Sequence, residues 1–266
     1  MQCLNHQERW LFFIGSIIFI ASTAGAFVSP INDPNCALII REGDIAYKNF
    51  DNSIALADYR RALEIDSSNY EALWKLARAY VDVGRSLPKN EQLQYYVFGE
   101  KLARRCLTLY PDSAEGHFFL AVALGREALQ QGGKRKIQIA KEVKAEAERA
   151  LQCNPAHDGA MHVLGRWHYE LADLNFIERA VAKIVFGELP SGASYEQAAH
   201  YFEQAIAHHP EAPVHHLEYG RTLLKLGRVA EARQQLERCV ELPELFWDDA
   251  QHKQAARRLL DKLDKS

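Results

Sequence analysis

The stretch Pro213–Cys239 reads PVHHLEYGRTLLKLGRVAEARQQLERC, and its small residues follow a fixed spacing. With Pro213 counted as position 1, glycine occupies positions 8 and 15, alanine position 20 and cysteine position 27. Small residues at such positions let two antiparallel helices approach closely, because larger side chains would push the helices apart. The stretch therefore predicts a helical hairpin.

Four further hairpins with the same spacing precede it, beginning at Cys36, Tyr70, Ala114 and Asp158. In the second, third and fourth hairpins the second helix arrives late, which predicts inserted helical residues. A 34-residue unit of two helices with small residues at their contact is the tetratricopeptide repeat. One hairpin cannot cover its own apolar face, so neighbouring hairpins must stack. The sequence thus predicts an all-α fold, a tetratricopeptide-type α-solenoid of about five helical hairpins with inserted helices.

A last amphipathic segment, about residues 248–263, carries leucines on one side and charges on the other. It is predicted to be the C-terminal capping helix that a solenoid needs to cover its final hairpin. The solenoid domain is expected to span residues 36–266, after a short linker at 27–35.

The N-terminal residues 1–26 are predicted to be a signal peptide. An apolar run follows Arg9 and ends in Ala24-Gly25-Ala26, a small-residue cleavage pattern. Cleavage there predicts an exported protein, periplasmic or secreted. The alternative is an uncleaved membrane anchor, since residues 10–28 reach the lower limit for a spanning helix.

Composition and motifs exclude several function classes. The 266-residue chain is 48% hydrophobic, which argues against bulk disorder, and its net charge of −3 argues against a nucleic-acid binder. Neither a phosphate-binding loop nor a hydrolase motif is present. The sequence therefore predicts no enzyme activity and no cofactor.

Cysteine and histidine carry little predicted chemistry. Cys106 and Cys239 both occupy position 27 of a repeat, where a small buried residue is required, so a structural role is expected. The pairs His208-His209 and His215-His216 resemble metal ligands, but no carboxylate or cysteine lies at a suitable helical spacing from them. No metal site is predicted.

The first helix of each hairpin should line a concave groove. Its groove-facing positions carry aromatic side chains and at least one cation in every repeat. The predicted ligand-binding residues are Tyr47, Lys48, Trp74, Arg78, Phe118, Arg126, Arg166, Tyr169, Arg221 and Lys225. Arginine binds carboxylate or phosphate through two oxygens at once, so an open groove for an acidic or extended peptide of a protein partner is expected. The alternative is a solvated face whose acidic residues pair with these cations.

A second function remains open because of a predicted inserted helix at residues 171–186. Its apolar stripe could pack on the solenoid flank or shelter acyl chains, and it consists of Leu174, Ile177, Val181, Ile184 and Val185. In the second case the chain would be a phospholipid-binding or lipid-transfer module, with an anionic lipid as its partner.

Three further motifs are Leu164-Gly165-Arg166-Trp167-His168-Tyr169, Phe186-Gly187-Glu188-Leu189-Pro190 and Cys239-Val240-Glu241-Leu242-Pro243. Through these motifs the chain, from about Gln94 to Leu263, resembles the regulator of microtubule dynamics family. The resemblance implies an α-helical, non-enzymatic adaptor of a family linked to microtubules and to organelle membrane contacts.

Overall fold

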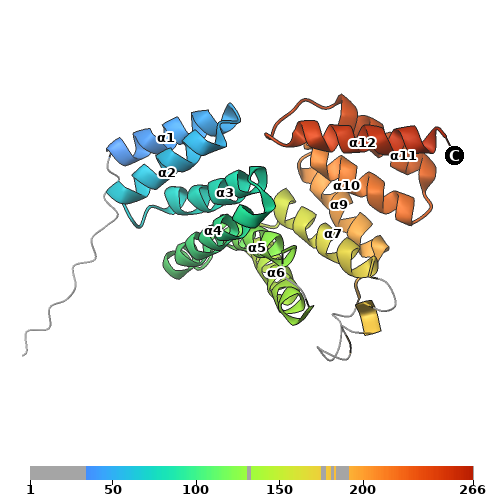
Figure 1. The fold of residues 1–266 in the computed structure, drawn as a ribbon, viewed down its shortest axis with the longest axis horizontal. Helices are drawn as coiled ribbons and strands as arrows, with labels where there is room; N and C mark the ends of the chain where they lie inside the picture. Colours follow the sequence, from blue (N-terminus) through green and yellow to red (C-terminus); the bar gives the residue numbers. More distant parts are fainter. Residues whose placement is uncertain (1–33, 131–132, 175–177, 181–182, 184–191, 266) are drawn as a thin grey trace, which may run out of the picture. The chain divides into compact units, whose positions relative to one another are not determined.

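The structure, a computed structural model, describes residues 34–130, 133–174, 178–180, 183 and 192–265 (Figure 1). The chain divides into Met1–Ile31, which lies outside the described residues, and a compact unit, Asn32–Ser266. The predicted signal peptide falls outside the described part, as does the predicted linker except for its last two residues, which are the first two of the helix Pro34–Lys48.

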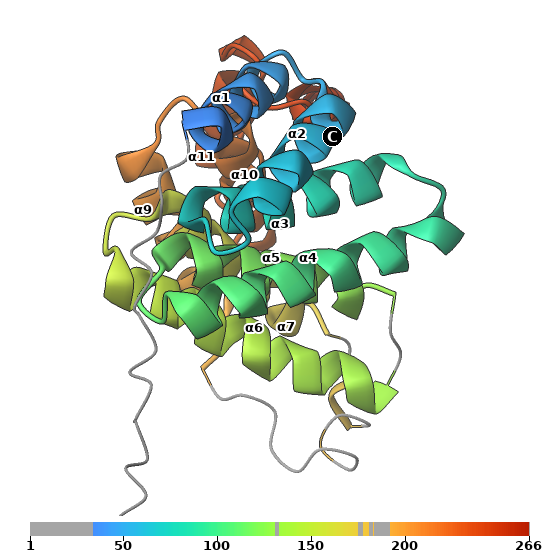
Figure 2. The same ribbon diagram turned by 90° about the vertical axis from the view of Figure 1, so that its left-hand side faces the viewer.

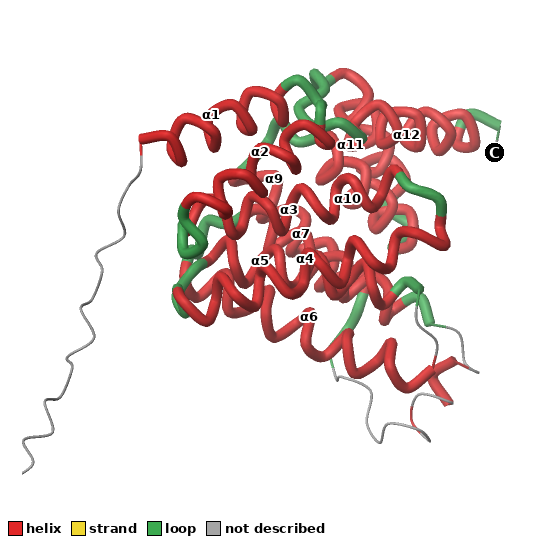
Figure 3. Tube along the Cα trace, turned by 60° about the vertical axis from the view of Figure 1, so that its left-hand side comes forward, coloured by secondary structure: helices red, strands yellow, loops and turns green. Residues whose placement is uncertain are grey.

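The unit is a series of helical hairpins, each with a first (A) and a second (B) helix. The A helices are α1 (Pro34–Lys48), α3 (Tyr70–Ser86), α5 (Ala114–Ala128), α7 (Asp158–Ala172) and α10 (Pro213–Lys225). The B helices are α2 (Asn52–Ile65), α4 (Lys89–Leu109), α6 (Gly133–Cys153), α9 (Tyr195–His208) and α11 (Val229–Glu241), and α12 (Asp249–Leu263) follows. The described residues contain no strand, and short loops connect most of the helices (Figure 3). The predicted all-α solenoid is confirmed.

Hairpin starts agree closely with the repeat spacing, because local side-chain chemistry fixes them. The helices α3, α5, α7 and α10 begin at the four predicted repeat starts, and α1 begins two residues before Cys36. Asn69 and Ser113 each accept a hydrogen bond from a backbone N–H in the first turn of the helix that follows. Such capping stabilises a helix start by about 1 kcal/mol.

Glycines at the predicted contact positions do allow close approach of the helices. A Cβ atom on Gly165 would lie 2.7 Å from Cε1 of Phe202, and one on Gly43 would lie 2.7 Å from Cε1 of Tyr59. Both rings are fully buried in the B helix of the same hairpin. The small residue and the ring opposite it therefore form one packing unit.

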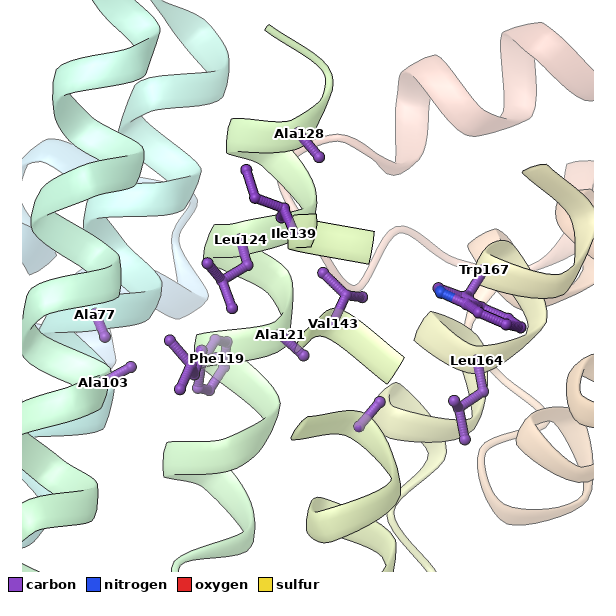
Figure 4. Packing of buried hydrophobic residues seen from close by; sticks show 12 residues of the cluster. Ala77, Ala103, Phe119, Ala121, Leu124, Ala128, Ile139, Val143, Leu164 and Trp167 are labelled. Carbon is purple, nitrogen blue, oxygen red and sulfur yellow. The ribbon is translucent and has the colours of Figure 1, made fainter. Parts of the chain in front are cut away.

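Stacking of the hairpins builds the core. Along the concave side α3 contacts α5, α5 contacts α7, and α7 contacts α10, while each B helix also packs on the next A helix. Figure 2 shows the stacked hairpins from the side. The largest cluster joins Phe119 and Leu124 of α5 to Ile139 of α6 and to Leu164 and Trp167 of α7 (Figure 4).

The predicted insertions and the predicted capping helix lie in different parts of the structure. Two of the delays are taken up by long B helices, since α4 and α6 have 21 residues each. The predicted cap is α12, which packs Leu259 and Leu260 over buried Leu236 and Cys239. Half of the predicted helix at 171–186 lies outside the described residues: α7 ends at Ala172, and residues 175–177, 181–182 and 184–186 are not described.

Candidate functional site: the concave face

The A helices bring the predicted groove residues to one side of the solenoid, but these residues have different surroundings. Three of the predicted cations are neutralised by the chain itself. Arg166 and Arg221 each lie 2.6 Å from a carboxylate oxygen of Glu218, whose side chain is buried. Lys225 pairs with Asp173. The part of the face formed by α7 and α10 therefore matches the alternative of internal ion pairing.

Arg78 of α3 is different, because aromatic rings rather than carboxylates surround its guanidinium. The group lies 3.6 Å from the ring centroid of Tyr47 and 5.2 Å from that of Trp74. Its Nη2 donates to the hydroxyl of Tyr59 at 3.1 Å. Its Nε is buried without a hydrogen-bond partner, and no carboxylate of the described residues lies within ion-pair distance of it. Arg78 thus keeps unused hydrogen-bonding capacity.

Arg126 of α5 also has no direct ion pair among the described residues, although the carboxylates of Asp82 and Asp248 act on it at longer range. Within the described part of the chain it makes neither a hydrogen bond nor an ion pair closer than 4 Å. Burial and the nearby charge of Arg85 lower the pKa of Arg126 to about 10. The guanidinium is still protonated at neutral pH, so it is a half-buried positive charge on the concave side.

Of the remaining predicted residues, the aromatic side chains pack against other rings, and the lysine is exposed to solvent. Phe118 packs against His157 and Phe119, with ring centroids 4.5 and 4.7 Å apart, and Trp74 stacks on Phe119. Tyr169 makes an edge contact with a neighbouring tyrosine ring of α9. Lys48 is exposed at the last turn of α1.

The expectation of a fully open groove is wrong. The segment between α11 and α12 reaches the end of α3. There Asp248 pairs with Arg85, and the ring centroid of Trp247 lies 5.0 Å from the same guanidinium. Asp248 is only 4% exposed. Part of the concave face is therefore covered by the chain's own polypeptide.

Sequence reasoning missed Arg85, Trp247 and Asp248. Arg85 belongs to the ten-residue insertion of the second repeat, and its helix α3 continues past the usual repeat length to Ser86. The other two residues follow the last repeat, outside the motif. A run of acidic and aromatic residues after Pro243 was the available signal, but repeat spacing assigns it no position.

The predicted structural role of the repeat cysteines agrees with their environment. Cys106 and Cys239 are both fully buried at the contact of their hairpins. Burial raises the pKa of the Cys239 thiol to about 12, so the thiolate needed for reactivity is suppressed.

Fold and site together define a tetratricopeptide repeat solenoid of the kind that serves as a protein-interaction scaffold. Its sequence matches the family described as "Regulator of microtubule dynamics protein 1-3" over residues 39–264. The chain belongs to this family, as its resemblance predicted.

Two similar relatives are regulator of microtubule dynamics protein 1 of Bos taurus and protein 3 of Rattus norvegicus. The first is 31% identical over 73% of this chain and 62% of its own length. The second is 28% identical over 69% of this chain and 39% of its own length. This chain therefore spans less than two thirds of the relatives that it matches.

Among solved structures, a thermophilic tetratricopeptide repeat protein of Thermus thermophilus superposes with a TM-score of 0.63. The match has 19% sequence identity and covers 84% of this chain and 99% of the other. At that identity it supports the fold alone.

The prediction that the protein is exported is wrong. The chain belongs to a family whose mammalian members are named as regulators of microtubule dynamics, and tubulin is a cytosolic protein. The prediction depended on residues 1–26, which the structure does not describe. Among the described residues, none of the helices combines the length and the apolar character needed to span a bilayer.

Proposed function

We propose that the chain is a non-catalytic scaffold whose concave face binds an acidic, extended segment of a protein partner, with Arg78 as the anchor and Arg126 as a second contact. The observation that carries this proposal is the contrast among the concave cations. Arg166, Arg221 and Lys225 are neutralised internally, whereas Arg78 and Arg126 have no carboxylate partner among the described residues.

Among the described residues, Arg78 and Arg126 have no directly paired carboxylate; Asp82 acts on both guanidinium groups, and Asp248 on that of Arg126, only through longer-range electrostatics. A ligand carboxylate at hydrogen-bond distance would add a stronger, direct interaction. Charge-assisted hydrogen bonds contribute about 1.5–3 kcal/mol each, roughly twice as much as neutral ones. The rings of Tyr47 and Trp74 fix the Arg78 guanidinium in place before any ligand arrives. Binding then loses little side-chain entropy.

The chain itself supplies an example of this recognition. Arg85 lies seven residues after Arg78, so both side chains project from the same side of α3. Asp248 and Trp247 bind Arg85 through a carboxylate and an aromatic ring. An external segment of similar acidic and aromatic character would engage Arg78 in the same way, one to two helical turns away.

The names of the relatives suggest where such a partner could be sought. They describe regulation of microtubule dynamics. A microtubule is therefore one candidate source of the acidic partner segment. This chain is proposed to bind a microtubule through the concave cations. The phospholipid alternative depended on the helix at 171–186, and no observation on the described residues favours it.

The test uses a fluorescein-labelled peptide of alternating glutamate and alanine with a central tryptophan, measured by fluorescence anisotropy. The double variant Arg78→Gln/Arg126→Gln is expected to weaken binding at least tenfold, and Arg78→Lys/Arg126→Lys to recover part of it. Arg257→Gln/Arg258→Gln, two exposed cations of α12, removes the same charge and is the control. Equal affinity of the wild type and the concave double variant would refute the assignment.

Cosedimentation with stabilised microtubules is the second measurement, with the same four proteins. The wild type and the α12 control are expected in the pellet, and the concave double variant in the supernatant. Sedimentation of all of them to the same extent would exclude the concave cations as the microtubule contact. It would leave the peptide result unaffected.

A further inference from the structure

Three side chains from two parts of the chain meet between the start of α7 and the start of α10. Asp158 is the first residue of α7, His209 follows α9, and His215 lies in the first turn of α10. The Oδ2 atom of Asp158 lies 3.1 Å from Nδ1 of His209 and 3.0 Å from Nε2 of His215. The carboxylate partner that the sequence did not reveal therefore comes from the preceding repeat.

The spacing of these three atoms is close to that of a zinc ligand set. All three lie within 4.8 Å of one another. A tetrahedral zinc ion with bonds of about 2.0–2.1 Å holds its ligand atoms about 3.3 Å apart. The two distances from Asp158, 3.0 and 3.1 Å, need to lengthen by only a few tenths of an ångström, and the two histidine nitrogens already lie within 4.8 Å of each other. One carboxylate and two imidazoles are also ligand types that zinc prefers.

Support from a neighbouring group is present as well. The second ring nitrogen of His215, Nδ1, lies 3.0 Å from Nδ1 of His162. Metal-bound histidines commonly donate this second N–H to a neighbouring acceptor, which fixes the ring orientation. The ring of His162 is itself held against Phe202 in an edge contact. His215 is thus presented with Nε2 directed at Asp158.

The three side chains differ in solvent exposure, and this difference is compatible with binding of a metal ion. The His215 side chain is 4% exposed, whereas those of Asp158 and His209 are 32% and 35% exposed. The buried imidazole gives a fixed ligand, and the open side lets an ion enter and leaves a fourth position toward solvent.

Other histidine and aspartate side chains that could bind a metal are already held by structural contacts. His216 is occupied at both ring nitrogens, by the side chain of Gln235 and by the carbonyl of Pro210. In the trio Asp248, Asp249 and His252, one carboxylate pairs with Arg85 and the other accepts two backbone N–H groups. Within the described part of the chain, the side chains of Asp158 and His209 make neither an arginine contact nor a backbone contact of this kind, and the Asp158 carboxylate hydrogen-bonds only to the two histidines.

We propose that Asp158, His209 and His215 bind one divalent zinc ion, with the fourth coordination position open. Such an ion would join α7 to the α9–α10 turn and connect the fourth and fifth hairpins. Its binding is independent of the arginine anchors, because neither Arg78 nor Arg126 supplies a ligand.

The test uses the untagged full chain, titrated with zinc against a chromophoric chelator, and with cobalt(II) as a spectroscopic probe. The wild type is expected to bind one equivalent and to give the intense visible bands of four-coordinate cobalt(II). His209→Gln and Asp158→Asn should each weaken zinc binding at least tenfold and abolish those bands. His208→Gln, an exposed histidine beside the site, is the matched control and should bind like the wild type.

Folding of the variants is checked by far-ultraviolet circular dichroism, and His209→Gln is the more conservative change because its side chain is partly exposed. Zinc should also raise the melting temperature of the wild type and of His208→Gln, but not that of folded His209→Gln. Absence of zinc binding to the wild type would overturn the proposal. Unchanged affinity in both ligand variants, or an equal loss in the control, would show adventitious binding only.

Discussion

At the scale of single residues, the glycines show which sequence positions are set by packing. Gly165 faces the fully buried ring of Phe202, while an added Cβ on Gly125 would meet no atom within 4 Å. Both glycines lie inside helices, where alanine is otherwise favoured by about 0.5–1 kcal/mol. The two positions therefore differ only in the neighbour that an added methyl group would meet.

Gly165→Ala is expected to destabilise the protein by about 1–2 kcal/mol, because overpacking a buried contact outweighs the gain in helix propensity. Gly125→Ala is expected to stabilise it by about 0.5–1 kcal/mol. Urea denaturation followed by circular dichroism measures both. A stabilising effect of Gly165→Ala would contradict the close approach of α7 and α9.

His168 provides a pH-dependent contribution. Burial, with the charge of Lys144, lowers the pKa of this imidazole, which stacks on Tyr201. A lowered pKa in the folded state means that the unfolded chain takes up the proton first. Stability should therefore fall as the pH drops below about 6.5, the ordinary histidine value.

His168→Gln should flatten this dependence, because glutamine does not titrate. Melting temperatures between pH 7.5 and 5.5 are expected to fall less in this variant than in the wild type. His208→Gln, with an exposed side chain, should follow the wild-type curve. Parallel curves for His168→Gln and the wild type would show that His168 makes no such contribution.

At the scale of elements, helix starts and hairpin contacts could be predicted from the sequence, since they depend on local spacing and capping. The start of α10 at Pro213 follows from residues within its own repeat. The contact of Arg85 with Asp248 could not be predicted. It joins residues 163 positions apart, and it depends on the curvature accumulated over several hairpins.

Asp248→Asn tests the importance of that contact. Loss of the carboxylate leaves Arg85 without its closest counter-charge, and the free energy of unfolding should fall by about 1.5–3 kcal/mol. Amide hydrogen exchange in residues 243–249 should accelerate. Glu244→Gln, at an exposed position in the same segment, is the control. Unchanged exchange rates in Asp248→Asn would mean that packing alone holds the segment on α3.

At the scale of the whole unit, the sequence predicts which cations lie on the concave face, but not which of them form ion pairs with the chain's own carboxylates. Repeat positions place a side chain on a face, whereas pairing depends on side chains from neighbouring hairpins. Arg166 and Arg221 share Glu218, and Arg78 instead meets aromatic rings from α1 and α3. Among the described residues, three of the predicted cations are therefore paired internally, whereas no ion pair involves Arg78, Arg126 or exposed Lys48. The proposed site is centred on Arg78 and Arg126.

The most direct test of this site is a nuclear magnetic resonance titration that observes arginine Nε–Hε groups as the acidic peptide is added. The Nε of Arg78 is buried and has no hydrogen-bond partner among the described residues, so its resonance should respond to a carboxylate that binds the neighbouring Nη groups. The largest shifts are expected at Arg78 and Arg126, with Arg166 and Arg221 nearly unchanged. Saturable binding with shifts confined to other arginines would contradict the assignment of the concave site.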